Sequence, residues 1–188
     1  LTTHVATSMV ERVRALGHGP VAGRRLDAVV CTGDNIDNQQ RNELDWLLAI
    51  LDGGRVVPDS GALGAYEGVQ DAAVPRARYW HPEPGVDDDY KAVGYPDVPG
   101  LLDRAIAPFD SPGLGIPWFS VYGNHDCNVQ GNGRRSDALD EVFAGDRKIT
   151  DLQPGQDGFA FIFQVFDHGP DVLADLRADR YPFREVTP

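Results

Sequence analysis

The sequence predicts an α/β fold, and three observations support that prediction. Two short apolar strands each run into a glycine turn, amphipathic segments flank both strands, and helical and strand patterns alternate along the chain. An apolar content of 41% and a charged content of 24% are ordinary for a globular protein. With 188 residues, the chain has room for one core, so we expect residues 1–188 to form a single domain.

The first elements follow from apolar spacing and from terminators. Thr2 and Thr3 can cap a helix that ends at Gly17. One face of this helix is expected to carry Val5, Met9, Val13 and Leu16. Residues 26–31 predict a short buried strand, and residues 39–51 predict a second helix. The inward face of that second helix is expected to consist of Leu44, Leu47, Leu48 and Leu51.

Residues 55–100 lose all periodicity and are expected to form an insertion within the domain. Prolines punctuate this stretch, and aromatic side chains stand between them. A long irregular segment in a compact domain is often a functional lid or wall. The alternative is an insertion that its own aromatic residues pack onto the surface.

The second half of the chain returns to recognisable patterns. Residues 116–122 are the second clear strand, and residues 159–166 are an apolar run that favours a strand. Helices are expected over residues 101–107, 136–143 and 171–180, followed by a terminal tail over 181–188.

The charge balance restricts the classes of partner. The formal net charge is −12, which argues against a general nucleic-acid surface because such surfaces need cations. No run of 18 apolar residues occurs, so no transmembrane segment is expected. The first residue is Leu rather than Met, so we expect that the natural N-terminus is missing, and the location of the protein stays open. Cys31 and Cys127 are too few for a disulfide framework and are expected to be small buried hydrophobic residues.

Polar, ligand-type side chains follow the glycine at the end of each clear strand. The two turns read Gly33-Asp34-Asn35-Ile36-Asp37 and Gly123-Asn124-His125-Asp126. Binding sites in open α/β sheets form at the carboxyl ends of strands. Oxygen ligands suit hard divalent cations, and imidazole suits zinc and iron. We therefore expect Asp34 and Asn124 to share a cation pocket, with His125 as proton donor and Asp126 orienting its ring.

The two turns resemble the Gly-Asp-x-x-Asp and Gly-Asn-His-Asp/Glu motifs of the calcineurin-like metallophosphoesterases. The strand before each motif and the order of the motifs also fit that superfamily. The stretch from Val30 to Asn35 and from Asn38 to Leu44 is similar to a bacterial, largely actinobacterial, subgroup. Each motif alone is only weakly to moderately specific, whereas the pair after two apolar strands is a strong signal.

This resemblance implies a metallophosphoesterase-like αββα sandwich with two divalent metal ions, Mn, Fe or Zn. By analogy, Asp34 bridges both metals and Asn124 binds the second, while His125 acts on the leaving group with Asp126 behind it. Asp37 and Asn35 would support these ligands. The implied function is hydrolysis of a phosphate mono- or diester by a metal-activated water. Two arginines after the second motif, Arg134 and Arg135, are candidates for binding the substrate phosphate.

The sequence also departs from the family pattern. No Asp-x-His and no His-x-His occurs, although the family uses an Asp-x-His upstream and a Gly-His-x-His near the C-terminal end. We therefore expect an internal fragment of a longer protein, an incomplete sandwich, and little turnover by this chain alone. A missing first strand would expose a sheet edge, which predicts self-association.

Alternatives remain open at this stage. Asp37 can cap the following helix, Asn124 can be a turn residue, and His125 can be an ordinary loop histidine. The whole chain can be a non-catalytic binding domain that retains the fold. An unrelated α/β module that binds an anion is less favoured, because no glycine-rich nucleotide loop is present.

Overall fold

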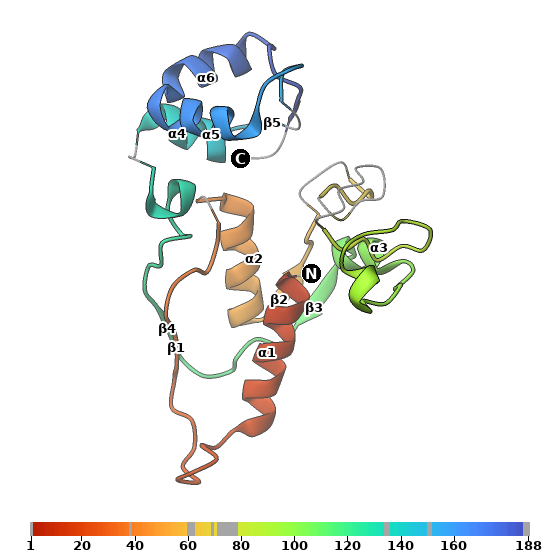
Figure 1. Ribbon diagram of the computed structural model, residues 1–188. Coiled ribbons are helices and arrows are strands. Elements are labelled where there is room, and N and C mark those ends of the chain that lie inside the picture. Colours follow the sequence, from red (N-terminus) through yellow and green to blue (C-terminus); the bar gives the residue numbers. More distant parts are fainter. Residues whose placement is uncertain are drawn as a thin grey trace. The chain divides into compact units, whose positions relative to one another are not determined.

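The computed structural model describes residues 2–37, 39–59, 63–68, 70, 79–133, 136–149 and 152–185. The chain divides into two compact units, one made of residues 1–17 and 49–115 and the other of residues 18–48 and 116–188. Figure 1 labels the helices and strands along the chain. In the part described, helices are mixed with three two-stranded sheets, an arrangement compatible with the predicted α/β class.

The first unit contains one long helix, shorter helical segments and one antiparallel ribbon. Helix α1 spans Thr2–Leu16, and helix α2, Arg41–Asp52, contributes its last turn. Strand β2 (Gly54–Val56) pairs with β3 (Phe109–Ser111), which follows the short helix α3 (Leu101–Ile106). Among the residues of this unit that the structure describes, the buried apolar side chains include Val10, Ile50, Leu51, Val56, Leu102, Ala105 and Leu114. The prediction of a helix at residues 101–107 is confirmed, whereas β2 was missed because a three-residue strand shows no periodicity.

Helix α1 forms as predicted but turns the opposite face inward. Val5, Met9 and Leu16 are exposed, whereas Thr3, Thr7 and Val10 are buried. Thr7 Oγ1 donates a hydrogen bond to the Thr3 carbonyl, so a polar atom is satisfied within the helix itself. The expected apolar face is therefore wrong, and burial of Thr7 is tolerated because its hydroxyl has a partner within the helix.

Two charged side chains organise the later part of the predicted insertion, over residues 79–100. Asp88 is buried and accepts hydrogen bonds from the backbone N–H groups of His81, Tyr90 and Lys91. Burial raises the pKa of its carboxyl, but these N–H groups outweigh that effect and leave the pKa below its ordinary value. The Lys91 ammonium, on the short 3₁₀ helix η1 (Lys91–Val93), contacts the carbonyls of Glu83 and Val86. This segment is thus held by polar contacts as well as by the ring contacts of Tyr95 with Trp80 and Tyr90.

The second unit contains the two strands that precede the motifs. Strand β1 (Val29–Cys31) pairs in parallel with β4 (Trp118–Ser120), with Val29 opposite Trp118 and Cys31 opposite Ser120. Both predicted strands are thereby confirmed, although each is shorter than expected, and β1 is not the buried strand that was predicted, since Val30 is exposed. Parallel pairing of adjacent strands places their carboxyl ends at the same edge.

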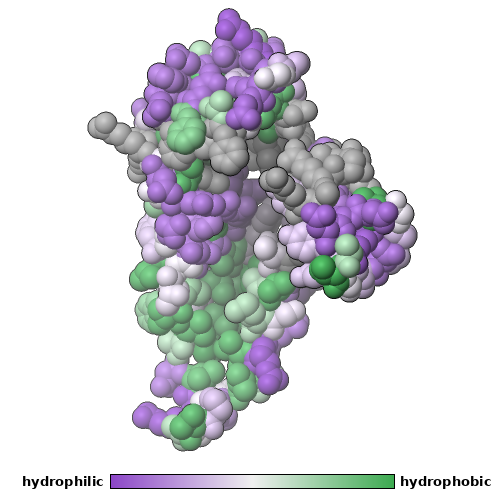
Figure 2. Space-filling view, in the orientation of Figure 1, coloured by the Kyte–Doolittle hydropathy of each residue, from purple (hydrophilic) through white to green (hydrophobic). Residues whose placement is uncertain are grey.

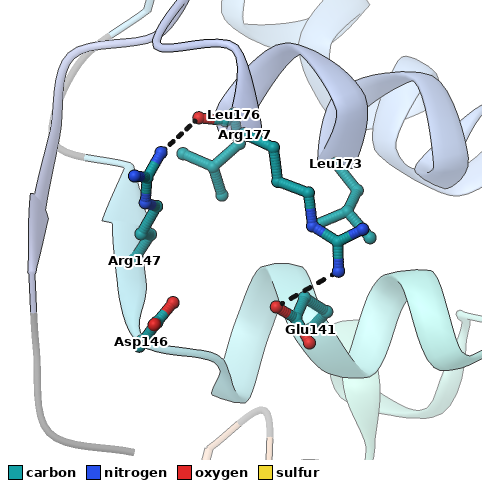
Figure 3. Close-up of a pocket in the computed structure, with 6 residues that line it drawn as sticks. All are labelled: Glu141, Asp146, Arg147, Leu173, Leu176 and Arg177. Carbon is teal, nitrogen blue, oxygen red and sulfur yellow. Dashed lines mark hydrogen bonds and ion pairs between the residues drawn. The ribbon is translucent and has the colours of Figure 1, made fainter.

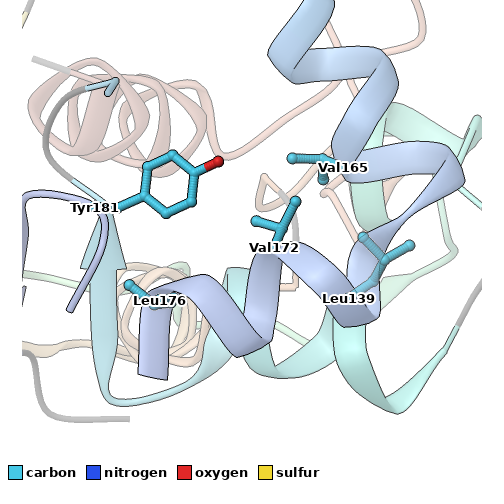
Figure 4. Close-up of a cluster of buried hydrophobic side chains, with 5 residues drawn as sticks. All are labelled: Leu139, Val165, Val172, Leu176 and Tyr181. Carbon is cyan, nitrogen blue, oxygen red and sulfur yellow. The ribbon is translucent and has the colours of Figure 1, made fainter. Parts of the chain in front are cut away.

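The C-terminal part of the second unit packs around one apolar cluster (Figure 4). Its elements are α4 (Asp137–Ala144), β5 (Arg147–Ile149), α5 (Gly158–Asp167), α6 (Gly169–Arg177) and β6 (Phe183–Glu185). The buried side chains of the cluster are Leu139, Val165, Val172, Leu176 and Tyr181.

Two predictions for this part are wrong. The apolar run over residues 159–166 is the helix α5, whose N-cap Asp157 accepts a hydrogen bond from the Ala160 N–H. Residues 181–188 are not only a tail, since β6 pairs antiparallel with β5. The helices over residues 136–143 and 171–180 are confirmed as α4 and α6, and Ser136 caps α4 through the Leu139 N–H.

Apolar side chains remain on the surface of the structure (Figure 2). On the β1–β4 sheet, the cross-strand pair Val30 and Phe119 is 61% and 62% exposed. Parallel strands are normally covered on both faces, so this exposure is unusual. Self-association through this sheet stays a prediction. Across the described residues, no helix combines the length and the apolar character needed to cross a membrane.

Candidate functional site

The two predicted turns meet at the carboxyl-end edge of the β1–β4 sheet. Gly33 and Gly123 come so close that a Cβ atom on Gly33 would lie 2.5 Å from the Gly123 nitrogen. Gly33 also has a φ of +107°, which L side chains rarely adopt. A Cβ atom on Gly123 would collide with the nitrogen and the side chain of Asp34. The glycines predicted as turn residues therefore allow the two loops to contact each other through their backbones.

Asp126 joins the two loops through backbone hydrogen bonds. Its Oδ1 accepts the N–H groups of Asn35 (2.8 Å) and Ile36 (2.9 Å). Its Oδ2 accepts the N–H groups of Gly123 (2.7 Å) and Asp34 (3.0 Å). The side chain is only 4% exposed. These contacts occupy both oxygens, so Asp126 connects the loops instead of orienting the His125 ring as the sequence led us to expect.

The environment of Asp126 shifts the titration of its carboxyl. Burial raises the pKa, but the N–H groups of Gly123, Ile36 and Asn35 lower it by more. The net pKa is below the ordinary value, because these donors stabilise the ionised form. The two loops, Gly33–Asp37 and Gly123–Asp126, together form what we call the loop pair. In the folded state the Asp126 carboxylate that joins them is thus ionised.

We expect the stability of the chain to decrease in acid partly through Asp126. A folded-state pKa below that of the unfolded chain, about 3.9, means that the stabilisation is present above that value. It is lost as the pH falls through the folded-state pKa. The measurement is the chemical-denaturation midpoint between neutral pH and pH 3. The wild type should lose more stability over this range than Asp126→Asn, whereas equal losses would contradict the assignment.

The His125 ring contacts Asp37. The distance between His125 Nδ1 and Asp37 Oδ1 is 3.2 Å, and both side chains are partly exposed. The backbone N–H of Asp37 donates to Glu43 Oε2 at 2.6 Å, which ties this loop to the start of α2. Asp37 therefore pairs with the His125 imidazole, which is the predicted proton donor. The carboxylate beside this ring is that of Asp37 and not that of Asp126.

Asp34 lies against the second loop. Its backbone is left-handed, with a φ of +54°, and its Oδ1 accepts the His125 N–H at 3.0 Å. The neighbouring Asn35 side chain donates to Ser120 Oγ at 3.0 Å and to the Val121 carbonyl at 3.3 Å. Asn35 thus supports the loop from the end of β4, a contact that only the pairing of the strands could reveal.

Asn124 is held by a turn that the sequence analysis did not single out. Its Nδ2 donates to the Gln130 carbonyl at 3.2 Å. This contact uses the amide nitrogen and leaves Oδ1 as the acceptor of the side chain. Gln130 lies in the short segment η2 (Asn128–Gly131), directly after the second motif.

The donor set near the loops fits a hard cation only in part. Asp34 and Asn124 offer carboxylate and amide oxygens, the ligands that Mg²⁺ and Mn²⁺ prefer. Over the stretches that the structure describes, however, no group of three or more His, Cys, Asp or Glu side chains could hold a metal ion. A cation at these two residues would thus take most of its ligands from water or from a substrate phosphate, as Mg²⁺ commonly does.

The remaining candidates do not add to this loop pair. Arg134 and Arg135 lie outside the described residues. Cys31 and Cys127 are free cysteines, and burial raises the pKa of the Cys31 thiol. A raised pKa disfavours the thiolate, so Cys31 is a poor nucleophile or metal ligand.

A separate hollow of about 240 Å³ lies between α4, β5 and α6 (Figure 3). Its lining residues are Glu141, Asp146, Arg147, Leu173, Leu176 and Arg177. Arg177 contacts Glu141 at 3.5 Å, and Arg147 donates to the Leu176 carbonyl and to Asp179. Both guanidinium groups are already paired within the protein, so this hollow does not offer free cations to a phosphate.

The chain was compared with protein-family models, with curated proteins and with solved structures, and no match was found in any of the three. The fold and the two loops alone therefore describe the class of site. It is a polar loop pair at the carboxyl-end edge of a parallel strand pair in a mixed α and β protein.

Proposed function

We propose that the loop pair is the site of a metal-dependent phosphoesterase that hydrolyses a phosphate mono- or diester. The observation that carries the proposal is the pairing of the His125 ring with Asp37, beside a loop contact between Asp34 and the His125 N–H. The His125 imidazole, which can transfer a proton, and the carboxylates of Asp34 and Asp37 thus come from the loops that follow two adjacent strands. We also propose that the fold is an αββα sandwich, which is more specific than the mixed α and β class described above.

In this proposal each side chain has a defined task. Asp37 accepts the Nδ1 proton and orients the ring, so Nε2 is the nitrogen that protonates the leaving oxygen. Asp34 and Asn124 would hold a divalent cation such as Mn²⁺, Fe²⁺ or Zn²⁺. When bound, such a cation polarises the phosphoryl oxygens and activates water. Asp126 keeps both loops in register.

A second candidate function is a catalytically incomplete or non-catalytic domain that binds a partner or ligand. The observation that favours it is the lack of a three-residue metal-ligand group in the described segments. In this case the loop pair would bind a cation weakly or not at all, and no ester would be hydrolysed.

Hydrolysis of chromogenic substrates separates the two candidates. We expect slow hydrolysis of a phosphomonoester or a phosphodiester that depends on added Mn²⁺. His125→Ala should reduce the rate roughly 100-fold, the usual contribution of a positioned general acid. Asp34→Ala should raise the concentration of Mn²⁺ needed for half-maximal rate.

The matched control is Asp45→Ala, which removes an exposed carboxylate on α2 and should leave the rate unchanged. Hydrolysis that survives both site substitutions would overturn the site assignment. No hydrolysis by the wild type, with or without Mn²⁺, would favour the non-catalytic candidate.

A further inference from the structure

The segment η2 contains two consecutive residues with left-handed backbones. Val129 has φ 51° and ψ 46°, and Gln130 has φ 54° and ψ 39°. A β-branched residue in this region is a conformational outlier, because its Cβ substituents crowd the backbone. Such strain persists only where surrounding contacts enforce it, and it clusters at functional sites.

Buried contacts hold this turn in place. Asn128, at its start, is 2% exposed, and its Nδ2 donates to Asp140 Oδ1 at 2.7 Å. The Asn128 carbonyl accepts the Gly133 N–H at 3.3 Å. The turn is thus anchored to helix α4, and its left-handed residues have a defined orientation.

The anchored turn fixes the side chain of Asn124. The Gln130 carbonyl can only accept a hydrogen bond, so the atom of the Asn124 amide that faces it must be Nδ2. Gly131 packs against the same side chain, since a Cβ atom on Gly131 would lie 3.3 Å from the Asn124 Cβ. The rotation of the amide is therefore determined, and Oδ1 lies on the side away from the Gln130 carbonyl.

We propose that the left-handed pair Val129–Gln130 is a positioning device that presents the Asn124 Oδ1 to a hard divalent cation. This inference rests on the proposed function, since it assigns the cation to the same site. The active group is the Gln130 backbone carbonyl, and its direction depends on a positive φ at residue 130.

The test compares two substitutions at one position. Gln130→Gly removes the side chain but keeps a carbonyl and readily adopts a positive φ. Gln130→Pro removes the same side chain and holds φ near −65°, which redirects the carbonyl. Proline also removes the Gln130 N–H, which lies within the 3₁₀ segment Asn128–Gly131, so the Asn124→Asp background described below is the control for damage to the turn itself.

The first readout is independent of any metal. In a ¹⁵N–¹H correlation spectrum, the Asn124 side-chain amide should show a hydrogen-bonded proton in the wild type and in Gln130→Gly. This signal should be lost in Gln130→Pro. An unchanged signal in the proline variant would overturn the inference.

The second readout is the Kd for Mn²⁺, measured by the paramagnetic signal of the free ion. Gln130→Pro should weaken binding at least tenfold, the usual effect of losing a group that orients a ligand. Gln130→Gly should stay within about twofold of the wild type. In an Asn124→Asp background, either carboxylate oxygen can face the cation, so Gln130→Pro should change the Kd by no more than about twofold.

The outcomes separate this inference from the proposed function. Equal weakening by Gln130→Pro in both backgrounds would indicate general damage to the loop and would overturn the inference. If the wild type binds Mn²⁺ but the Asn124 signal is the same in Gln130→Pro as in the wild type, only the positioning inference fails. If the Asn124 signal is lost in Gln130→Pro as expected but the wild type binds no Mn²⁺, the cation of the proposed function is refuted. The inference that Oδ1 is presented to that cation is then refuted as well.

Discussion

Asp126→Asn should lower the free energy of unfolding of the second unit by about 3 kcal/mol at neutral pH. Each Asp126 oxygen accepts at least two N–H groups. Whichever oxygen becomes an amide nitrogen, two backbone donors lose their acceptor and face another donor. Unsatisfied buried donors cost about 1–3 kcal/mol each, which sets the expected size.

The measurement is chemical denaturation combined with hydrogen exchange at the Asn35 and Ile36 amides. Both amides should lose protection in the variant, because both donate to Asp126 Oδ1. The matched control is Asp45→Asn, whose side chain is 55% exposed and pairs with Arg41 at the surface. That control should cost less than about 1 kcal/mol. Equal effects of the two substitutions would show that Asp126 does not join the loops.

Gly33→Ala should have a still larger effect, about 4 kcal/mol, because it combines steric overlap with backbone strain. The new Cβ would lie 2.5 Å and 2.6 Å from the Gly123 nitrogen and Cα. These are backbone atoms, so no side-chain rotation can relieve the overlap. The loops must separate, and the contact between His125 and Asp37 should be lost with them.

A matched glycine isolates the two causes. Gly94 has a φ of +99°, but a Cβ atom added there would meet nothing within 4 Å, so Gly94→Ala introduces strain without overlap. It should cost about 1–2 kcal/mol. In Gly123→Ala the new Cβ would overlap Asp34, although the φ of Gly123 does not itself require glycine. This variant should therefore also be strongly destabilised, by the overlap alone. Comparable thermal unfolding of Gly33→Ala and Gly94→Ala would contradict the close approach of the loops.

These two predictions concern the same property of the proposed site. Asp126 and the two glycines have no direct part in the proposed chemistry, yet they determine where the proposed chemical groups lie. His125 reaches Asp37 and Asp34 only while the two loops stay in contact. A loss of activity in these variants would therefore accompany a loss of stability, whereas His125→Ala should affect activity alone.

Local sequence determined much of the secondary structure but not the direction of each face. The strands before Gly33 and Gly123 were recognisable because short apolar runs ended in turn residues. The apolar run of α5 misled, since a short continuous run fits a buried strand or a buried helix equally well. Its capping by Asp157 was the available signal for a helix. The inward face of α1 could not be predicted either, because burial of Thr3 and Thr7 depends on what packs against them.

By itself, the sequence determined that two glycine turns rich in ligand-type side chains follow two apolar strands. Only the tertiary structure decided which carboxylate does what. Asp37 and Asp126 are chemically identical, and their roles differ because one lies beside an imidazole nitrogen and the other among backbone N–H groups. The imidazole beside Asp37, and all but one of the N–H groups around Asp126, come from the loop after the other strand of the pair, and the β1–β4 register brings them within hydrogen-bond distance. Hydrogen bonds are short and directional, so their partners depend on this long-range register, which residue spacing along the chain does not encode.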